Sequence, residues 1–436
     1  AVCLLAAFFA HLMVPGVYTK ALAHDVRALR RLVGLFGASQ FLGNSLVAHP
    51  DLADSILFRK DTPDTASAAR AVAEEIATAE VGDVESFVGA LRRAKRRVTM
   101  EVGVCDLAGE IDFREASRIL SALADASIAA AVDYALGERK GDRPKLAVLA
   151  LGKLGGREIG YGSDLDLVFI HEEIEGVTAE SAIRVAQRAL RLLDAPHGDG
   201  AGYELDTRLR PSGSQGLLVV SLEAFTRYHE QVAEPWERQA LLKARACAGD
   251  ADLGARTIAV AQLAAYQLGA PSPERLHQLR LRMQQELSGE RIAKGRYDAK
   301  LGSGGIADIE FATQWLQMKF GKDERVRTAE TEEAIVRLED IDVLDSASAM
   351  IFREAYVFLR RLDQRARVHH GSGGALIERD APGLAILARR LGMRDGPRSS
   401  ASTSLLEHYV ALTREVRRAY LGVLEIRDFR EDSGSS

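Results

Sequence analysis

Two aspartates separated by one residue, Asp164 and Asp166, begin a largely apolar run that ends at His171. On a β-strand, side chains two residues apart point to the same face and lie about 6.5 Å from each other. Two carboxylates on one face repel each other unless their pKa values shift or a cation lies between them. Oxygen ligands favour Mg²⁺ or Mn²⁺. The pair therefore predicts a metal site for phosphoryl or nucleotidyl transfer, which commonly uses two ions about 4 Å apart.

A third ligand should come from a neighbouring strand. The segment 203–210, YELDTRLR, reads as a strand that would place Glu204, Asp206, Arg208 and Arg210 on one face. A carboxylate beside guanidinium groups suits a site that holds a metal and a triphosphate together. We expect Asp206 to be the third ligand, and Glu204 is the competing choice.

The connection before the aspartate pair is rich in glycine. Gly152, Gly155 and Gly156 would let backbone N–H groups approach an anionic phosphate closely. Lys153 could add a charge and Ser163 a hydroxyl. The stretch is neither a Walker A motif nor a dinucleotide fingerprint, so its weight comes from its position directly before the Asp-x-Asp strand.

Each of these features also has an ordinary structural explanation. An isolated Asp-x-Asp at a strand end is usually solvated surface, strand arginines often form structural ion pairs, and glycines often form plain turns. Their occurrence together, in this order and around short strands, favours a functional site.

The surrounding elements form a small α/β pattern. Apolar runs predict strands at 145–151, 164–171 and 203–210, and helical spacing predicts a helix at 179–194. The order β–loop–β–α–β predicts a mixed-sheet domain over residues 141–250.

The flanking ranges, residues 1–140 and 251–436, carry apolar residues at helical intervals. No strand pattern interrupts the second range, which we expect to be a helical bundle. The predicted fold class is α+β, mostly α, with three domains divided near residues 140 and 250. The first 14 residues are almost wholly apolar and do not begin with Met, and we interpret them as the cut start of a longer chain. The tail, 428–436, is polar, and we expect it to be frayed.

Composition limits the class of protein. The chain has 436 residues, 47% of them hydrophobic, which suits two or three folded domains. Its net charge is −5, and no basic tract indicates nucleic-acid binding. Three widely spaced cysteines predict neither disulfides nor a zinc site. The apolar start is shorter than the roughly 20 residues that span a bilayer. We therefore expect a cytoplasmic protein without nucleic-acid or membrane partners.

Gly152, followed after eleven residues by Asp164-x-Asp166, resembles the signature of the DNA polymerase β-type nucleotidyltransferase superfamily. Longer blocks are similar to bacterial glutamine synthetase adenylyltransferases, and together they extend over nearly the whole chain. These blocks are residues 36–52, 151–167, 203–213, 235–245 and 304–311.

Members of that family contain two homologous halves. One half attaches AMP from ATP to a tyrosine of glutamine synthetase, and the other removes it by phosphorolysis. This chain is long enough for one half, and its YGSDLDL and YELDTRLRPSG forms resemble the C-terminal, adenylylating half. The resemblance implies Mg²⁺ or Mn²⁺ as cofactor, ATP as substrate and glutamine synthetase as partner. A PII-type nitrogen signal protein is a further candidate partner.

The resemblance also assigns residues. It implies Asp164, Asp166 and Asp206 as catalytic metal ligands. It implies nucleotide or phosphate contacts from a second set, namely Gly152, Lys153, Ser163, Arg208 and Arg210. Lys153 stands where the wider superfamily usually has Gly or Ser, which puts the triphosphate contact of that small residue in doubt. Glu237, Lys243 and Arg245 match family blocks without an assigned role.

Three alternatives stay open. The first is the deadenylylating half, which would use the same site for phosphorolysis. The second is a nucleotidyltransferase acting on RNA ends, which the lack of a basic face disfavours. The third is a non-catalytic regulatory half, which has no need of three metal-holding acids.

Overall fold

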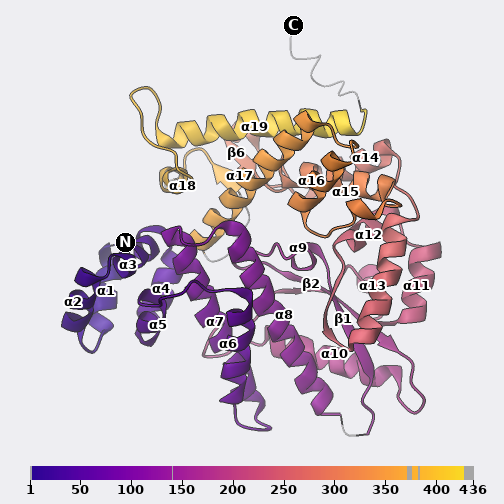
Figure 1. Ribbon diagram of the computed structural model, residues 1–436, viewed down its shortest axis with the longest axis horizontal. Coiled ribbons are helices and arrows are strands. Elements are labelled where there is room, and N and C mark those ends of the chain that lie inside the picture. Colours follow the sequence, from indigo (N-terminus) through magenta and orange to yellow (C-terminus); the bar gives the residue numbers. More distant parts are fainter. Residues whose placement is uncertain (1, 140, 371–375, 382, 427–436) are drawn as a thin grey trace. The chain divides into compact units, whose positions relative to one another are not determined.

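The computed structural model describes residues 2–139, 141–370, 376–381 and 383–426 (Figure 1). It is 65% helix and 8% strand, which confirms the predicted α+β class with mostly α content. Two compact units are present. One contains residues 2–231, 243–260 and 367–370, and the other contains residues 232–242, 261–366 and the described residues from 376 onward. The predicted domain boundaries near residues 140 and 250 follow changes of element type and stay predictions. The predicted frayed tail lies outside the described residues.

Helices make up the N-terminal part of the first unit. Five of them begin at an Asp or Ser whose side chain accepts a hydrogen bond from a first-turn N–H, which satisfies donors that have no partner within the helix. These caps are Asp25, Ser39, Asp64, Asp83 and Asp112. The helices are α1 (Val2–His11), α2 (Pro15–His24), α3 (Val26–Ala38), α4 (Gln40–Ala48), α5 (Ala53–Leu57), α6 (Thr65–Ala77), α7 (Val84–Ala108) and α8 (Phe113–Gly137).

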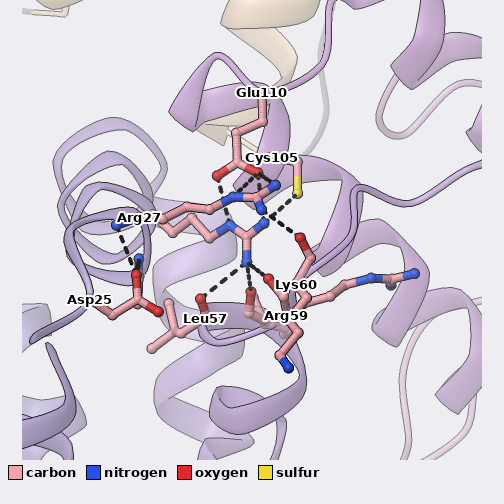
Figure 2. Close-up of polar contacts among 10 residues, drawn as sticks. Asp25, Arg27, Leu57, Arg59, Lys60, Cys105 and Glu110 are labelled. Carbon is pink, nitrogen blue, oxygen red and sulfur yellow. Dashed lines mark hydrogen bonds and ion pairs between the residues drawn. The ribbon is translucent and has the colours of Figure 1, made fainter.

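A partly buried ion cluster joins α3 to the segments that follow α5 and α7. Glu110, just after α7, accepts hydrogen bonds from Arg27 and Arg31 of α3. Arg31 also donates to the carbonyls of Leu57 and Arg59 beyond it. Figure 2 shows the Glu110 carboxylate meeting Arg27 above the Leu57 and Arg59 backbone. Burial by itself would raise the pKa of Glu110, but the hydrogen bonds from Arg31 and Arg27 outweigh it and lower the pKa to about 2.

Helix α8 is, within the described part of the chain, the one helix long and apolar enough to cross a membrane. It has 25 residues, and its most apolar window has a mean hydropathy of 1.5. Within the protein, 61% of that window is buried, which is the pattern of a helix in a protein core.

The sheet of the first unit contains β1 (Lys145–Ala150), β2 (Leu165–Glu172), β3 (Leu205–Asp206), β4 (Val219–Ser221) and β5 (Arg245–Gly249). The main order is β3-β2-β1-β5, and β4 also pairs with β2. Strands β1 and β2 are antiparallel, whereas β3 and β4 both run parallel to β2. The predicted mixed sheet is thus confirmed, and α10 (Ala179–Asp194) has the predicted bounds. Helix α11 (Leu222–Gln231) follows β4.

The predicted strand 203–210 is wrong over most of its length, because β3 contains two residues. The Asp206 carboxylate accepts a hydrogen bond from the backbone N–H of Arg208, two residues on. This local bond gives the backbone an alternative to the strand ladder, and the chain turns after Asp206. The predicted alternation of faces therefore does not extend to Arg208 and Arg210.

The second unit is mainly helical, with a core of packed apolar residues that includes Ile309, Phe352 and Tyr420. Contrary to the prediction of a region without strands, β6 (Arg296–Asp298) and β7 (Leu376–Glu378) form a small antiparallel sheet. Three-residue strands carry too few side chains to show an alternating pattern. From residue 232 onward the helices are α12 (Pro235–Ala240), α13 (Ala251–Tyr266), α14 (Pro273–Leu287), α15 (Ile306–Phe320), α16 (Thr331–Asp340), α17 (Ser346–His370), α18 (Leu384–Arg390) and α19 (Ala401–Val423). Residues 251–260 of α13 and 367–370 of α17 belong to the first unit.

Candidate active site

Strand register brings Asp166 and Asp206 side by side. They are Cα partners across the parallel β2–β3 pair, where neighbouring strands lie about 4.8 Å apart. The backbone N–H of Leu165 donates to the carbonyl of Glu204 at 2.9 Å, which fixes this register. Leu165 is fully buried, so alternation directs the half-buried Asp166 to the opposite face. Asp164 is exposed and immediately precedes β2.

Gly152 lies against the Asp166 carboxylate. Strand β1 ends opposite the start of β2, and the N–H of Leu151 donates to the Asp166 carbonyl at 3.0 Å. The chain then begins the four-residue helix α9 (Gly152–Gly155). Gly152 has φ +52°, and a Cβ atom there would lie 2.2 Å from Asp166 Oδ2. The glycine-rich loop is therefore adjacent to the aspartate pair, and this position requires glycine for both its backbone conformation and its space.

Two basic residues at or just before β5, Lys243 and Arg245, hold the glycine-rich loop in position. Arg245 donates to the Leu154 carbonyl at 3.0 Å and forms an ion pair with Asp125 at 2.8 Å. Lys243 forms an ion pair with Glu158 at 2.7 Å, and both side chains are largely buried. These contacts supply a positioning role for Lys243 and Arg245 that the sequence did not indicate. The partners lie 85 and 120 residues away along the chain, so no local pattern could have shown them.

The Arg208 guanidinium forms an ion pair with the Asp206 carboxylate. Its Nη2 lies 2.5 Å from Oδ2 and its Nε lies 3.0 Å from Oδ1. These side-chain hydrogen bonds are the main cause that lowers the pKa of Asp206. The hydrogen bond to Asp206 is the main cause that raises the pKa of the Arg208 guanidinium, and the negative charges of Asp206, Asp166 and Asp164 raise it further. All three predicted ligands therefore act electrostatically on one exposed cation.

Arg210 and Ser163 are bonded to their own loops. Arg210 donates to the carbonyls of Thr207 and Gly216 and thereby holds the turn after β3. The Ser163 hydroxyl accepts a hydrogen bond from the Gly160 N–H at 3.0 Å. The structure thus shows loop-shaping bonds for both residues, and their predicted nucleotide contacts stay predictions, as does that of Lys153.

The carboxylates of Asp164, Asp166 and Asp206 suit a divalent cation only if the Arg208 side chain moves. Among the described residues, no three His, Cys, Asp or Glu side chains form a ready metal-ligand group. Both oxygens of Asp206 are bonded to Arg208. The Arg208 side chain is 77% exposed, whereas that of Asp206 is 16% exposed, so Arg208 can move into solvent while Asp206 stays in place. Movement of Arg208 away from Asp206 would make the Asp206 oxygens available, beside Asp166, to a hard cation.

Several known proteins are similar to this chain in amino-acid sequence. A family model described as glutamate-ammonia ligase adenylyltransferase matches residues 29–260, and one described as GlnD PII-uridylyltransferase matches residues 275–424. Similar curated proteins include three named bifunctional glutamine synthetase adenylyltransferase/adenylyl-removing enzyme. That of Nocardia farcinica is 30% identical over 421 residues, which is 92% of this chain and 41% of the relative. Those of Chromobacterium violaceum and Bordetella bronchiseptica are each 34% identical over 81% of this chain, and the matches cover 40% and 39% of their lengths.

The chain thus spans about two fifths of the length of the curated relatives that it matches. The first family model covers more than half of the chain and includes every predicted site residue. This chain therefore belongs to the glutamate-ammonia ligase adenylyltransferase family.

Proposed function

We propose that this chain transfers AMP from ATP to a tyrosine of glutamine synthetase and releases pyrophosphate. The observation that carries the proposal is the register of β2 and β3, which sets Asp166 beside Asp206 next to the glycine loop. Family membership supports the reaction class, because the relatives are named for adding and removing adenylyl groups on glutamine synthetase. A PII-type partner and a cytoplasmic location stay predictions.

Asp164, Asp166 and Asp206 would hold Mg²⁺ or Mn²⁺. A bound divalent cation stabilises negative charge on the attacking and leaving oxygens of nucleotidyl transfer. Gly152 brings the backbone of the glycine-rich loop against the Asp166 carboxylate, and the N–H groups of such a loop can bind a phosphate. Arg208, once released from Asp206, offers a planar guanidinium that suits a phosphate.

The acceptor tyrosine needs activation, because a phenol has a pKa near 10. The exposed Asp164 or the half-buried Asp166 can accept the phenolic proton as the tyrosine oxygen attacks the α-phosphorus. The new bond joins that oxygen to phosphorus, the α–β phosphoanhydride bond breaks, and pyrophosphate leaves with its electron pair. Arg245 and Lys243 hold the loop in place throughout, so positioning accounts for much of the chain's contribution.

The third ligand can be tested by comparing two neighbours. Asp206→Ala should abolish AMP transfer, because Asp206 is the register partner of Asp166. Glu204→Ala should keep at least about a tenth of the rate, since the exposed Glu204 contributes to β3 through its backbone carbonyl. Initial rates of AMP incorporation measure both variants. A larger loss in Glu204→Ala than in Asp206→Ala would transfer the ligand role to Glu204.

The direction of the reaction can be tested separately. The YGSDLDL and YELDTRLRPSG forms favour the adenylylating half, although the same carboxylates could support phosphorolysis. With Mg²⁺, ATP and unmodified glutamine synthetase, we expect a mass gain of one AMP per modified subunit together with pyrophosphate. With adenylylated synthetase and phosphate, we expect little ADP. ADP release without AMP transfer would identify the chain as the adenylyl-removing half, and the absence of both reactions would contradict the proposal.

A further inference from the structure

A cavity of about 450 Å³ lies within the first unit. Helices α4, α7 and α8 line one side of it, and loops 159–163 and 198–204 line the other. Much of the wall is apolar and includes Leu42, Met100 and Leu123. None of the three predicted metal ligands lines the cavity, but one loop ends directly before Asp164 and the other ends two residues before Asp206. The cavity therefore adjoins the aspartate site, and Ser163 and Glu204 line it, whereas the three aspartates lie outside its lining.

Three basic residues of α7 line this cavity, namely Arg92, Lys95 and Arg96. Their spacing places them on one side of the helix. Arg92 is 1% exposed, and its Nε and Nη2 donate to the carbonyls at the end of α10. Within the described part of the chain, Arg92 Nη1 and Arg96 Nε are buried and have no hydrogen-bond acceptor. Buried charged donors without acceptors are unfavourable, and they leave the positive charge of Arg92 incompletely compensated on the side of α7 that lines the cavity.

Lys95 adds a third cation, which forms no ion pair with an acid in the part of the chain that the structure describes. Its ammonium group donates to the Gly202 carbonyl at 2.5 Å and lies 4.3 Å from the centre of the Tyr203 ring. Burial, followed by the charge of Arg92, lowers the pKa of Lys95 to about 8, and Glu204 opposes this only in part. Asp199, the other acid of the lining, is shared between Arg93 and Arg96. The cavity therefore has an excess of positive charge beside an apolar wall.

We propose that this cavity binds a small organic anion, a carboxylate or phosphate with an apolar body, and that the bound anion alters the rate of AMP transfer. The charged end would meet Arg92, Lys95 and Arg96, and the apolar body would contact the wall. Cavities of this size commonly hold small ligands. The effect on rate rests on the proposed function, whereas binding does not.

Binding can be measured with 1-anilinonaphthalene-8-sulfonate, a fluorescent anion with an apolar ring system. We expect one saturable site per chain. Phenyl phosphate or benzoate should displace the dye, and the stronger competitor identifies the preferred head group. Benzyl alcohol, which is neutral, should not. Lys95→Met keeps the length of the side chain and removes its charge, so it should weaken binding about tenfold or more. Thr99→Phe, on the cavity wall, should block binding by filling space.

Arg97→Met is the matched control, because it removes a cation from the same helix outside the cavity lining. It should bind the dye as the wild type does, and circular dichroism should show that all three variants fold. The stronger competitor should change the AMP transfer rate of the wild type and leave that of Thr99→Phe unaffected. Unchanged dye affinity in Lys95→Met would overturn the site, as would displacement by benzyl alcohol. Competitive displacement by ATP would assign the cavity to the nucleotide site instead, and a rate insensitive to the bound anion would overturn the coupling.

Discussion

Asp166→Asn should reduce the rate of AMP transfer by on the order of a thousandfold and leave the fold intact. Asparagine has nearly the same size as aspartate but carries no charge, so it is a poor ligand for a hard cation. The bonds that place β2 should survive, because the Asp166 carbonyl still accepts from Leu151 and the buried Leu165 and Leu167 are unchanged. Initial rates of AMP incorporation and far-ultraviolet circular dichroism measure the two expectations.

Asp252→Asn is the control for this substitution. Asp252 is exposed at the start of α13 and forms surface ion pairs with Lys145 and Arg256. The same change of charge there should alter the rate by no more than about twofold, because exposed ion pairs contribute little. A rate for Asp166→Asn within tenfold of the wild type would remove Asp166 from the metal site.

The placement of Asp166 could be predicted from the sequence because one strong pattern determines it. Leu165, Leu167 and the apolar run after them require burial, and alternation then leaves Asp166 on the other face. The sequential order of β1, the glycine loop and β2 likewise brings Gly152 to the start of β2. Local patterns of this kind agree with the tertiary structure, and the fold class followed from them.

The turn after Asp206 could not be predicted from the same rule. The pattern of YELDTRLR fits a strand, but a bond from the Arg208 N–H to the Asp206 side chain competes with the ladder. Burial patterns carry no information about that competition. The strand predicted to carry Arg208 and Arg210 was therefore wrong, although Arg208 still contacts Asp206 as the prediction placed it.

Contacts between segments far apart along the chain could not be predicted from the sequence either. Arg245 reaches the glycine loop and Asp125, and the basic cavity gathers residues from helices and loops that are far apart along the chain. The sheet of β6 and β7 joins segments about 80 residues apart. Pairings of this kind depend on how elements pack, and a single sequence does not encode that in a local period.

Gly152→Ala should reduce AMP transfer by about a hundredfold through a single added methyl group. The residue has φ +52°, and a left-handed conformation costs an L-residue about 1–2 kcal/mol. The larger effect is steric, since the added Cβ would lie 2.2 Å from Asp166 Oδ2. The carboxylate or the loop must then move by about 1 Å, and a displacement of this size at a reacting centre commonly costs two orders of magnitude in rate.

Two further variants separate these causes. Gly137→Ala, at the end of α8, adds a methyl group where nothing lies within 4 Å and φ is not positive, so its activity should match the wild type. Gly152→Asn tolerates the left-handed backbone better than alanine does but brings the same Cβ against Asp166. Equal losses for Gly152→Ala and Gly152→Asn would assign the effect to the displaced carboxylate. Recovery in Gly152→Asn would assign it to backbone strain instead, and near-normal rates in both variants would show that the loop does not need to lie against Asp166 during transfer.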